Sequence, residues 1–157
     1  YKDISFEKNM ISFDGAKIDK FFQNLDWKLN SETPEGVFIK KVRSTISFLD
    51  KLDKNYIFIT DLQFYNLVLD KKDFSPVKYW ATEVSYPSKK NQLRKNFEEF
   101  FLKKILDNNV EYIVVDQKTT LFNENILDFK FLSKCLENKS EKKDLNLVIY
   151  KFRFNCF

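Results

Sequence analysis

The sequence predicts an α/β fold with a small, mainly parallel sheet flanked by amphipathic helices. Two short and nearly continuous apolar runs, at 56–60 (YIFIT) and 111–115 (EYIVV), are typical of strands buried on both faces of a parallel sheet. A third strand is expected near 146–154, where apolar and polar residues alternate. Helical segments lie between these runs, and such alternation favours an α/β architecture.

The first part of the chain contains two predicted helices. Apolar residues at helical spacing follow Asp14, a good capping residue, so a short helix is expected at 15–25. Residues 25–29 alternate in polarity and suggest a short extended segment. Pro34 stands at the favoured first position of a longer helix that the apolar stripe carries to about residue 53.

Apolar residues that repeat every three or four positions predict three further helices, at 62–69, 91–108 and 124–137. Between the first two, Pro76 and Pro87 interrupt regular structure. The polar run 139–144 is expected to be a solvated turn before the last strand.

The composition limits the classes of protein and of site that this chain can represent. The length of 157 residues suits one domain, so 1–157 is predicted to be a single soluble α/β domain, and 17% aromatic residues argue against disorder. The absence of histidine removes the commonest general base and most catalytic zinc sites. Gly15 and Gly36 lie in no phosphate-binding loop. We therefore expect no catalytic residue, cofactor or metal site in this chain.

Lysine dominates the charge. Of 27 basic residues only Arg43, Arg94 and Arg153 are arginine, and the net charge is only +4, so no nucleic-acid partner is expected. One cluster stands at the start of the helix predicted at 91–108, and it either meets anionic lipid headgroups or is a solvated face. Its members are Lys89, Lys90, Arg94, Lys95, Lys103 and Lys104.

Asp61 and Asp116 each follow a predicted buried strand directly. Ligands bind beyond the carboxyl ends of parallel strands, so two carboxylates there can bind a ligand or act as acid and base. The alternative is that both aspartates cap helices or turns, as aspartate often does.

The loop at 74–87 concentrates aromatic residues, of which Tyr79, Trp80 and Tyr86 are the main candidates for ligand contact. Aromatic rings on loops can stack on sugars or bases. The alternative is that these rings fold the loop onto the core.

The two cysteines, Cys135 and Cys156, cannot make a zinc site alone. They are either a disulfide that ties the C-terminal tail to the last predicted helix, or two unrelated thiols.

Several segments together resemble the soluble C-terminal domains of multi-pass bacterial membrane proteins of the GT-C glycosyltransferase type. These proteins are similar to dolichyl-phosphate-mannose–protein mannosyltransferases. The segments, in chain order, are ITDLQF at 59–64, FSP at 74–76 with Tyr79-Trp80, SYP at 85–87, FFLKKILDNNVEYIVV at 100–115 and the two late cysteines.

The resemblance, which covers about residues 10–157, implies a parent protein that transfers a sugar from a polyprenyl-phosphate donor and carries its catalytic acids in the membrane region. The present chain would face the periplasm, where a Cys135–Cys156 disulfide persists. The first residue, Tyr1, is not methionine, which agrees with a piece cut from a longer protein. No run of about 18 apolar residues is present, so no membrane span is expected within the chain.

Two functions follow as hypotheses. The first is a non-catalytic accessory domain on the extracytoplasmic side of a membrane glycosyltransferase-like protein, with the membrane region and a glycan or polyprenyl-linked sugar as partners. The second is a free-standing small α/β enzyme or nucleotide-binding protein that uses Asp61 and Asp116. The candidate ligand-binding residues are Asp61, Gln63, Tyr79, Trp80, Tyr86 and Asp116.

Overall fold

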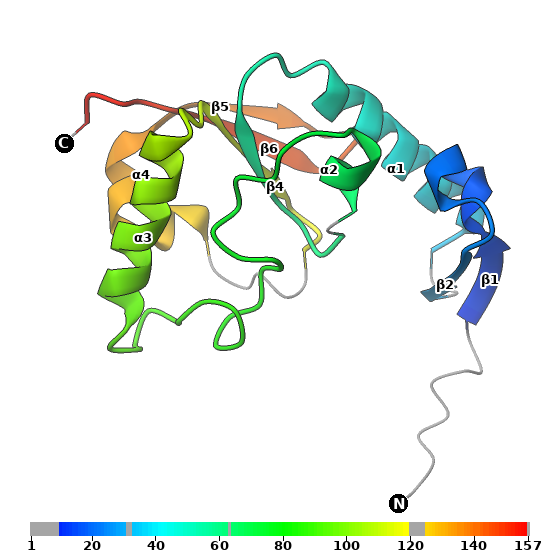
Figure 1. Cartoon of the computed structure of the whole chain (residues 1–157), viewed down its shortest axis with the longest axis horizontal. Helices are drawn as coiled ribbons and strands as arrows, with labels where there is room; N and C mark the ends of the chain where they lie inside the picture. The colour runs from blue at the N-terminus through cyan, green and yellow to red at the C-terminus, as the bar shows by residue number, and fades with distance from the viewer. Residues whose placement is uncertain (1–9, 31–32, 63, 120–124, 157) are drawn as a thin grey trace, which may run out of the picture. The chain divides into compact units, whose positions relative to one another are not determined.

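A computed structural model describes residues 10–30, 33–62, 64–119 and 125–156 (Figure 1). The chain divides into two compact units, Tyr1–Lys51 and Leu52–Phe157, which we describe separately. The organisation as one domain over 1–157 stays a prediction. No helix in the described part of the chain is both long and apolar enough to cross a membrane.

The first unit is a two-stranded antiparallel sheet followed by a long helix. Its elements are β1 (Met10–Asp14), the 3-10 turns η2 (Gly15–Lys17) and η3 (Lys20–Phe22), β2 (Asp26–Asn30) and α1 (Glu35–Asp50). The single helix expected at 15–25 is wrong, because Asp14 and Asp19 each cap a separate turn. Their carboxylates accept hydrogen bonds from the main-chain nitrogens of Ala16 and Phe21, both at 2.8 Å.

The second unit is built on a four-stranded sheet. Its strands are β3 (Tyr56–Ile59), β4 (Tyr112–Asp116), β5 (Leu136–Lys142) and β6 (Leu147–Phe152), in the order β3-β4-β6-β5. The three predicted strands are confirmed as β3, β4 and β6. The mainly parallel character is not confirmed, since among the described strands of this sheet β3 and β4 pair in parallel and the other two pairs are antiparallel.

The reason for the mixed sheet is a hairpin that the sequence pattern concealed. Strand β5 carries the polar sequence LENKSEK, and it joins β6 through a short turn at 143–146, so the two strands must run antiparallel. The expected helix at 124–137 is accordingly shorter. It consists of η4 (Ile126–Asp128) and α4 (Lys130–Cys135), and the expected turn at 139–144 lies largely in β5.

Strand β3 is buried on both faces, as its apolar run predicts. Ile57 and Ile59 belong to the core that α3 (Arg94–Asp107) and α4 cover, together with Phe101 of α3. On the opposite face, the ring of Phe58 lies 5.1 Å from that of Tyr65 in α2 (Tyr65–Val68). Helices α3 and α4 lie side by side (Figure 1).

Candidate functional site

The two candidate aspartates lie at the same end of the sheet. In the parallel pairing of β3 and β4, Ile59 lies opposite Val115, so Asp61 and Asp116 both lie just beyond this last shared pair. This is the placement that the sequence predicts for ligand-binding carboxylates.

Asp116 also has a structural role. Its side chain is only 6% exposed, and one carboxylate oxygen accepts a hydrogen bond from the main-chain nitrogen of Lys118 at 3.0 Å. The Asp116 carbonyl accepts a second bond from the nitrogen of Thr119. Asp116 therefore shapes the turn after β4. Asp61, at the same end of the sheet, is half-buried.

The described residues contain no group of three or more cysteine or acidic side chains that could hold a metal ion. Gln63, the remaining candidate near this end of the sheet, lies outside the described residues.

The aromatic loop divides into core residues and one exposed ring. Trp80 is fully buried and Tyr86 nearly so, and their ring centroids are 5.6 Å apart. The Trp80 ring also lies 5.5 Å from that of Phe101 in α3. A ligand can stack on Trp80 or Tyr86 only if the loop opens, whereas Tyr79 is 43% exposed and accessible as it stands.

Polar contacts hold the loop in this form. The Ser85 hydroxyl donates to the Tyr79 carbonyl at 2.5 Å, and the Tyr86 hydroxyl lies 2.6 Å from that of Thr82. The Glu83 carboxylate accepts bonds from the main-chain nitrogen of Ser88 and the side-chain amide of Asn91, at 3.1 and 3.0 Å. Hydrogen bonds from Ser88 and then Asn91 lower the pKa of Glu83 below its ordinary value.

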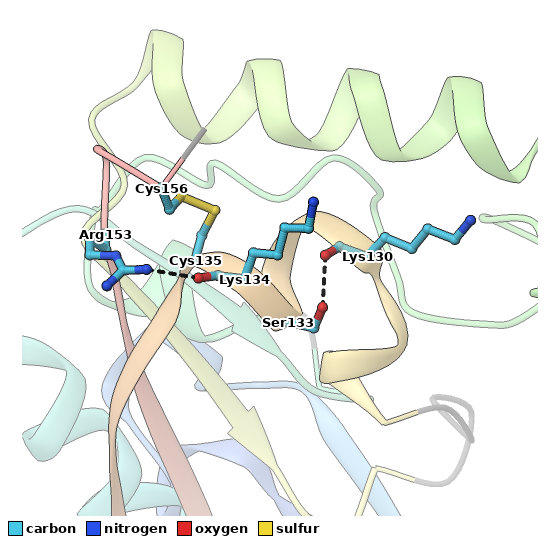
Figure 2. The surroundings of a disulfide bond; sticks show 6 residues. All are labelled: Lys130, Ser133, Lys134, Cys135, Arg153 and Cys156. Carbon is cyan, nitrogen blue, oxygen red and sulfur yellow. Dashed lines mark hydrogen bonds between the residues drawn. A yellow bond between two sulfur atoms is a disulfide. The ribbon is translucent and has the colours of Figure 1, made fainter.

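The cysteines form the disulfide Cys135–Cys156, with their Cα atoms 5.3 Å apart (Figure 2). Cys135 ends α4 and is buried, and Cys156 lies on the C-terminal tail, 21 residues later. The tail is held a second time, because the Arg153 guanidinium donates to the Lys134 carbonyl at 3.2 Å.

The basic cluster at the start of α3 is not uniformly a surface patch. Arg94 is only 7% exposed, and its guanidinium donates to Glu98 at 3.0 Å and to the Pro87 carbonyl at 2.8 Å. Lys89 pairs with Asp128 at 2.7 Å. The sequence offered one signal of the difference, since an arginine among 24 lysines marks a position where a planar, multidentate donor is needed.

Sequence reasoning missed a groove between α3 and α4, because its walls come from segments about 30 residues apart. The groove has a volume of about 410 Å³. Its lining residues are Lys95, Glu98, Glu99, Leu102, Lys130, Phe131, Lys134 and Cys156.

Comparison with known proteins finds no family model, no curated protein and no solved structure that matches the chain. The class that the fold and these sites define is therefore a mixed α/β protein that carries a disulfide.

Proposed function

We propose that this chain is a non-catalytic accessory domain on the extracytoplasmic, periplasmic side of a bacterial membrane protein of the glycosyltransferase type. Its partners are the membrane region of that protein and a glycan or polyprenyl-linked sugar. The observation that carries the proposal is the Cys135–Cys156 disulfide.

The disulfide supports an oxidising, extracytoplasmic compartment for this chain. Disulfides persist in oxidising compartments and are rare where thioredoxin and glutathione keep thiols reduced. The bond joins a buried cysteine at the end of α4 to the tail, so it has a structural place in the fold. The proposed link to a glycosyltransferase comes from the resemblance of segments such as 59–64 and 100–115.

Two features support a binding role rather than a catalytic one. The chain has no histidine, and Asp116 is engaged in the turn after β4. Within the aromatic loop, the exposed Tyr79 ring is a surface that a sugar can reach without rearrangement of the loop.

The compartment is tested by counting thiols in the full gene product isolated from its own host. The protein is alkylated under denaturing conditions before any reductant is added, and the modified cysteines are counted by mass spectrometry. We expect no free thiol at Cys135 or Cys156. A Cys156→Ser variant is the control and should show one reactive or mixed-disulfide thiol. Two free thiols in the native host would contradict the proposal.

The sugar contact is tested in membranes that contain the full gene product. We expect Tyr79→Ala to reduce sugar transfer to acceptor, while Val84→Ala, an exposed change in the same loop, leaves transfer unchanged. Equal transfer by both variants would remove Tyr79 from the proposed contact.

One observation favours the second candidate, a small enzyme or nucleotide-binding protein. The pairing of β3 and β4 brings Asp61 and Asp116 to one end of the sheet. This candidate predicts that the chain binds Mg–ATP and that Asp61→Asn weakens the binding. Calorimetric titration without detectable heat for the unaltered chain would exclude ATP as its ligand.

A further inference from the structure

The groove between α3 and α4 combines an apolar floor with a basic wall. Leu102, Phe131 and Cys156 supply apolar surface, and Lys130 and Lys134 stand one turn apart on α4. Figure 2 shows both lysine side chains extending from α4 on the side where α3 runs, with Lys134 next to the disulfide.

A second hollow of about 370 Å³ shares Lys95, Glu98 and Lys130 with this groove and reaches to Lys89. The two hollows therefore lie next to each other along the α3–α4 seam. Their volumes fall within the range of about 300 to 1,000 Å³ that is common for small-ligand sites.

The acidic groups that line these two hollows already have partners. Glu98 pairs with Arg94 at 3.0 Å, and Asp128 pairs with Lys89 at 2.7 Å. Glu99 lies 3.8 Å from Lys95. In contrast, the ammonium groups of Lys130 and Lys134 have no ion-pair partner among the residues that the structure describes. The groove therefore offers two uncompensated positive charges beside apolar surface.

We propose that the α3–α4 groove binds an anionic membrane lipid, with one acyl chain on Leu102, Phe131 and Cys156 and the headgroup phosphate at Lys130 and Lys134. The inference stands on these residues alone and does not depend on the proposed glycosyltransferase role. Lysines beside apolar surface match a ligand that is charged at one end and apolar at the other. A free phosphate would leave the apolar floor uncovered.

The test uses lysophosphatidylglycerol, a single-chain anionic lipid, in calorimetric titration of the chain below the critical micelle concentration. We expect saturable binding that weakens at high salt, because exposed charges are screened. The double variant Lys130→Gln/Lys134→Gln should weaken binding by about ten- to thirty-fold, since each lysine near a lipid surface contributes on the order of 1 kcal/mol.

The matched control is Lys143→Gln/Lys151→Gln, which removes the same charge from exposed positions outside the groove. It should bind as the unaltered chain does, and both variants should keep the thermal midpoint. As a second readout, lipid should shift the amide NMR signals of α3 and α4. A Leu102→Gln variant should weaken lipid binding with the charges intact.

Three further probes test whether the groove needs both the charge and the acyl chain of the lipid. Glycerol phosphate lacks the chain, dodecyl maltoside lacks the charge, and a glutamate-rich peptide lacks the acyl group, so each should bind at least tenfold more weakly. Equal binding of any one of them, no binding of the lipid, or full binding by the Lys130/Lys134 variant would overturn the proposal.

Discussion

The guanidinium carbon of Arg94 lies 3.9 Å from the centroid of the Phe129 ring. The same side chain donates to Glu98 and to the Pro87 carbonyl. One arginine thus joins the end of the aromatic loop, the first turns of α3 and the segment before α4, all within the second unit.

Arg94→Lys should therefore destabilise the second unit by about 1–3 kcal/mol, because a lysine ammonium cannot stack on the ring and reach both oxygens at once. Denaturant unfolding is followed by Trp80 fluorescence in a Trp27→Phe background, so that only the second unit reports. Arg153→Lys is the control, since its bond to the Lys134 carbonyl is exposed, and a change within about 0.5 kcal/mol is expected. Equal effects of the two substitutions would contradict the role given to Arg94.

Reduction of Cys135–Cys156 should lower the free energy of unfolding by about 3 kcal/mol, the loop-closure entropy for a bridge that spans 21 residues. Urea unfolding with and without reductant measures this difference. A Cys135→Ala/Cys156→Ala variant should be as unstable as the reduced protein and indifferent to reductant. A reductant effect in that variant would show that the loss comes from elsewhere.

The two glycines should respond to alanine in opposite directions. A Cβ atom at Gly15 would lie 2.6 Å from the Phe22 carbonyl oxygen and 2.7 Å from the Trp27 ring nitrogen, whereas one at Gly36 meets nothing within 4 Å. Gly15→Ala should destabilise the first unit by about 1–3 kcal/mol through overpacking. Gly36→Ala should stabilise α1 by about 0.5–1 kcal/mol.

Amide hydrogen exchange of β1, β2 and α1 measures both glycine effects locally. Faster exchange in Gly36→Ala, or unchanged exchange in Gly15→Ala, would refute the packing described for these positions.

Glu83 should contribute to stability at neutral pH and lose that contribution in acid. Hydrogen bonds from Ser88 and Asn91 lower its pKa in the folded state below the ordinary value of 4.5. The folded state therefore binds the proton less readily than the unfolded state does. The contribution of Glu83 to stability is complete above about pH 4.5, and it disappears as the pH falls through the lower, folded-state pKa. In Glu83→Gln, the loss of stability between pH 5 and pH 2 should be shallower than in the unaltered chain. An equal loss of stability in acid for Glu83→Gln and the unaltered chain would contradict this role of Glu83.

The sequence predicted β3, β4 and β6 because burial of their side chains leaves a direct signal. Both faces of β3 are covered, so its residues form an unbroken apolar run, and the apolar pattern likewise located β4 and β6. Strand β5 carries largely polar side chains, so no apolar periodicity marked it.

The candidate sites also differ in how far the sequence could predict them. The positions of Asp61 and Asp116 followed from the ends of two predicted strands, and the parallel pairing of β3 and β4 agrees with that placement. Burial of Trp80 and Tyr86 depends on α3 packing over the loop, which local spacing does not reveal. The α3–α4 groove is lined by residues of two helices that are distant in sequence, such as Leu102 and Phe131, so only the assembled structure shows it.

Strand β5 also bears on how copies of this protein behave when crowded. An outermost strand offers unpaired main-chain groups that another chain can extend into a larger sheet. Here such an approach would bring the incoming strand alongside the exposed charges of Glu141 and Lys142. The polar composition that hid β5 from the sequence pattern thus discourages strand addition and aggregation along this border of the sheet.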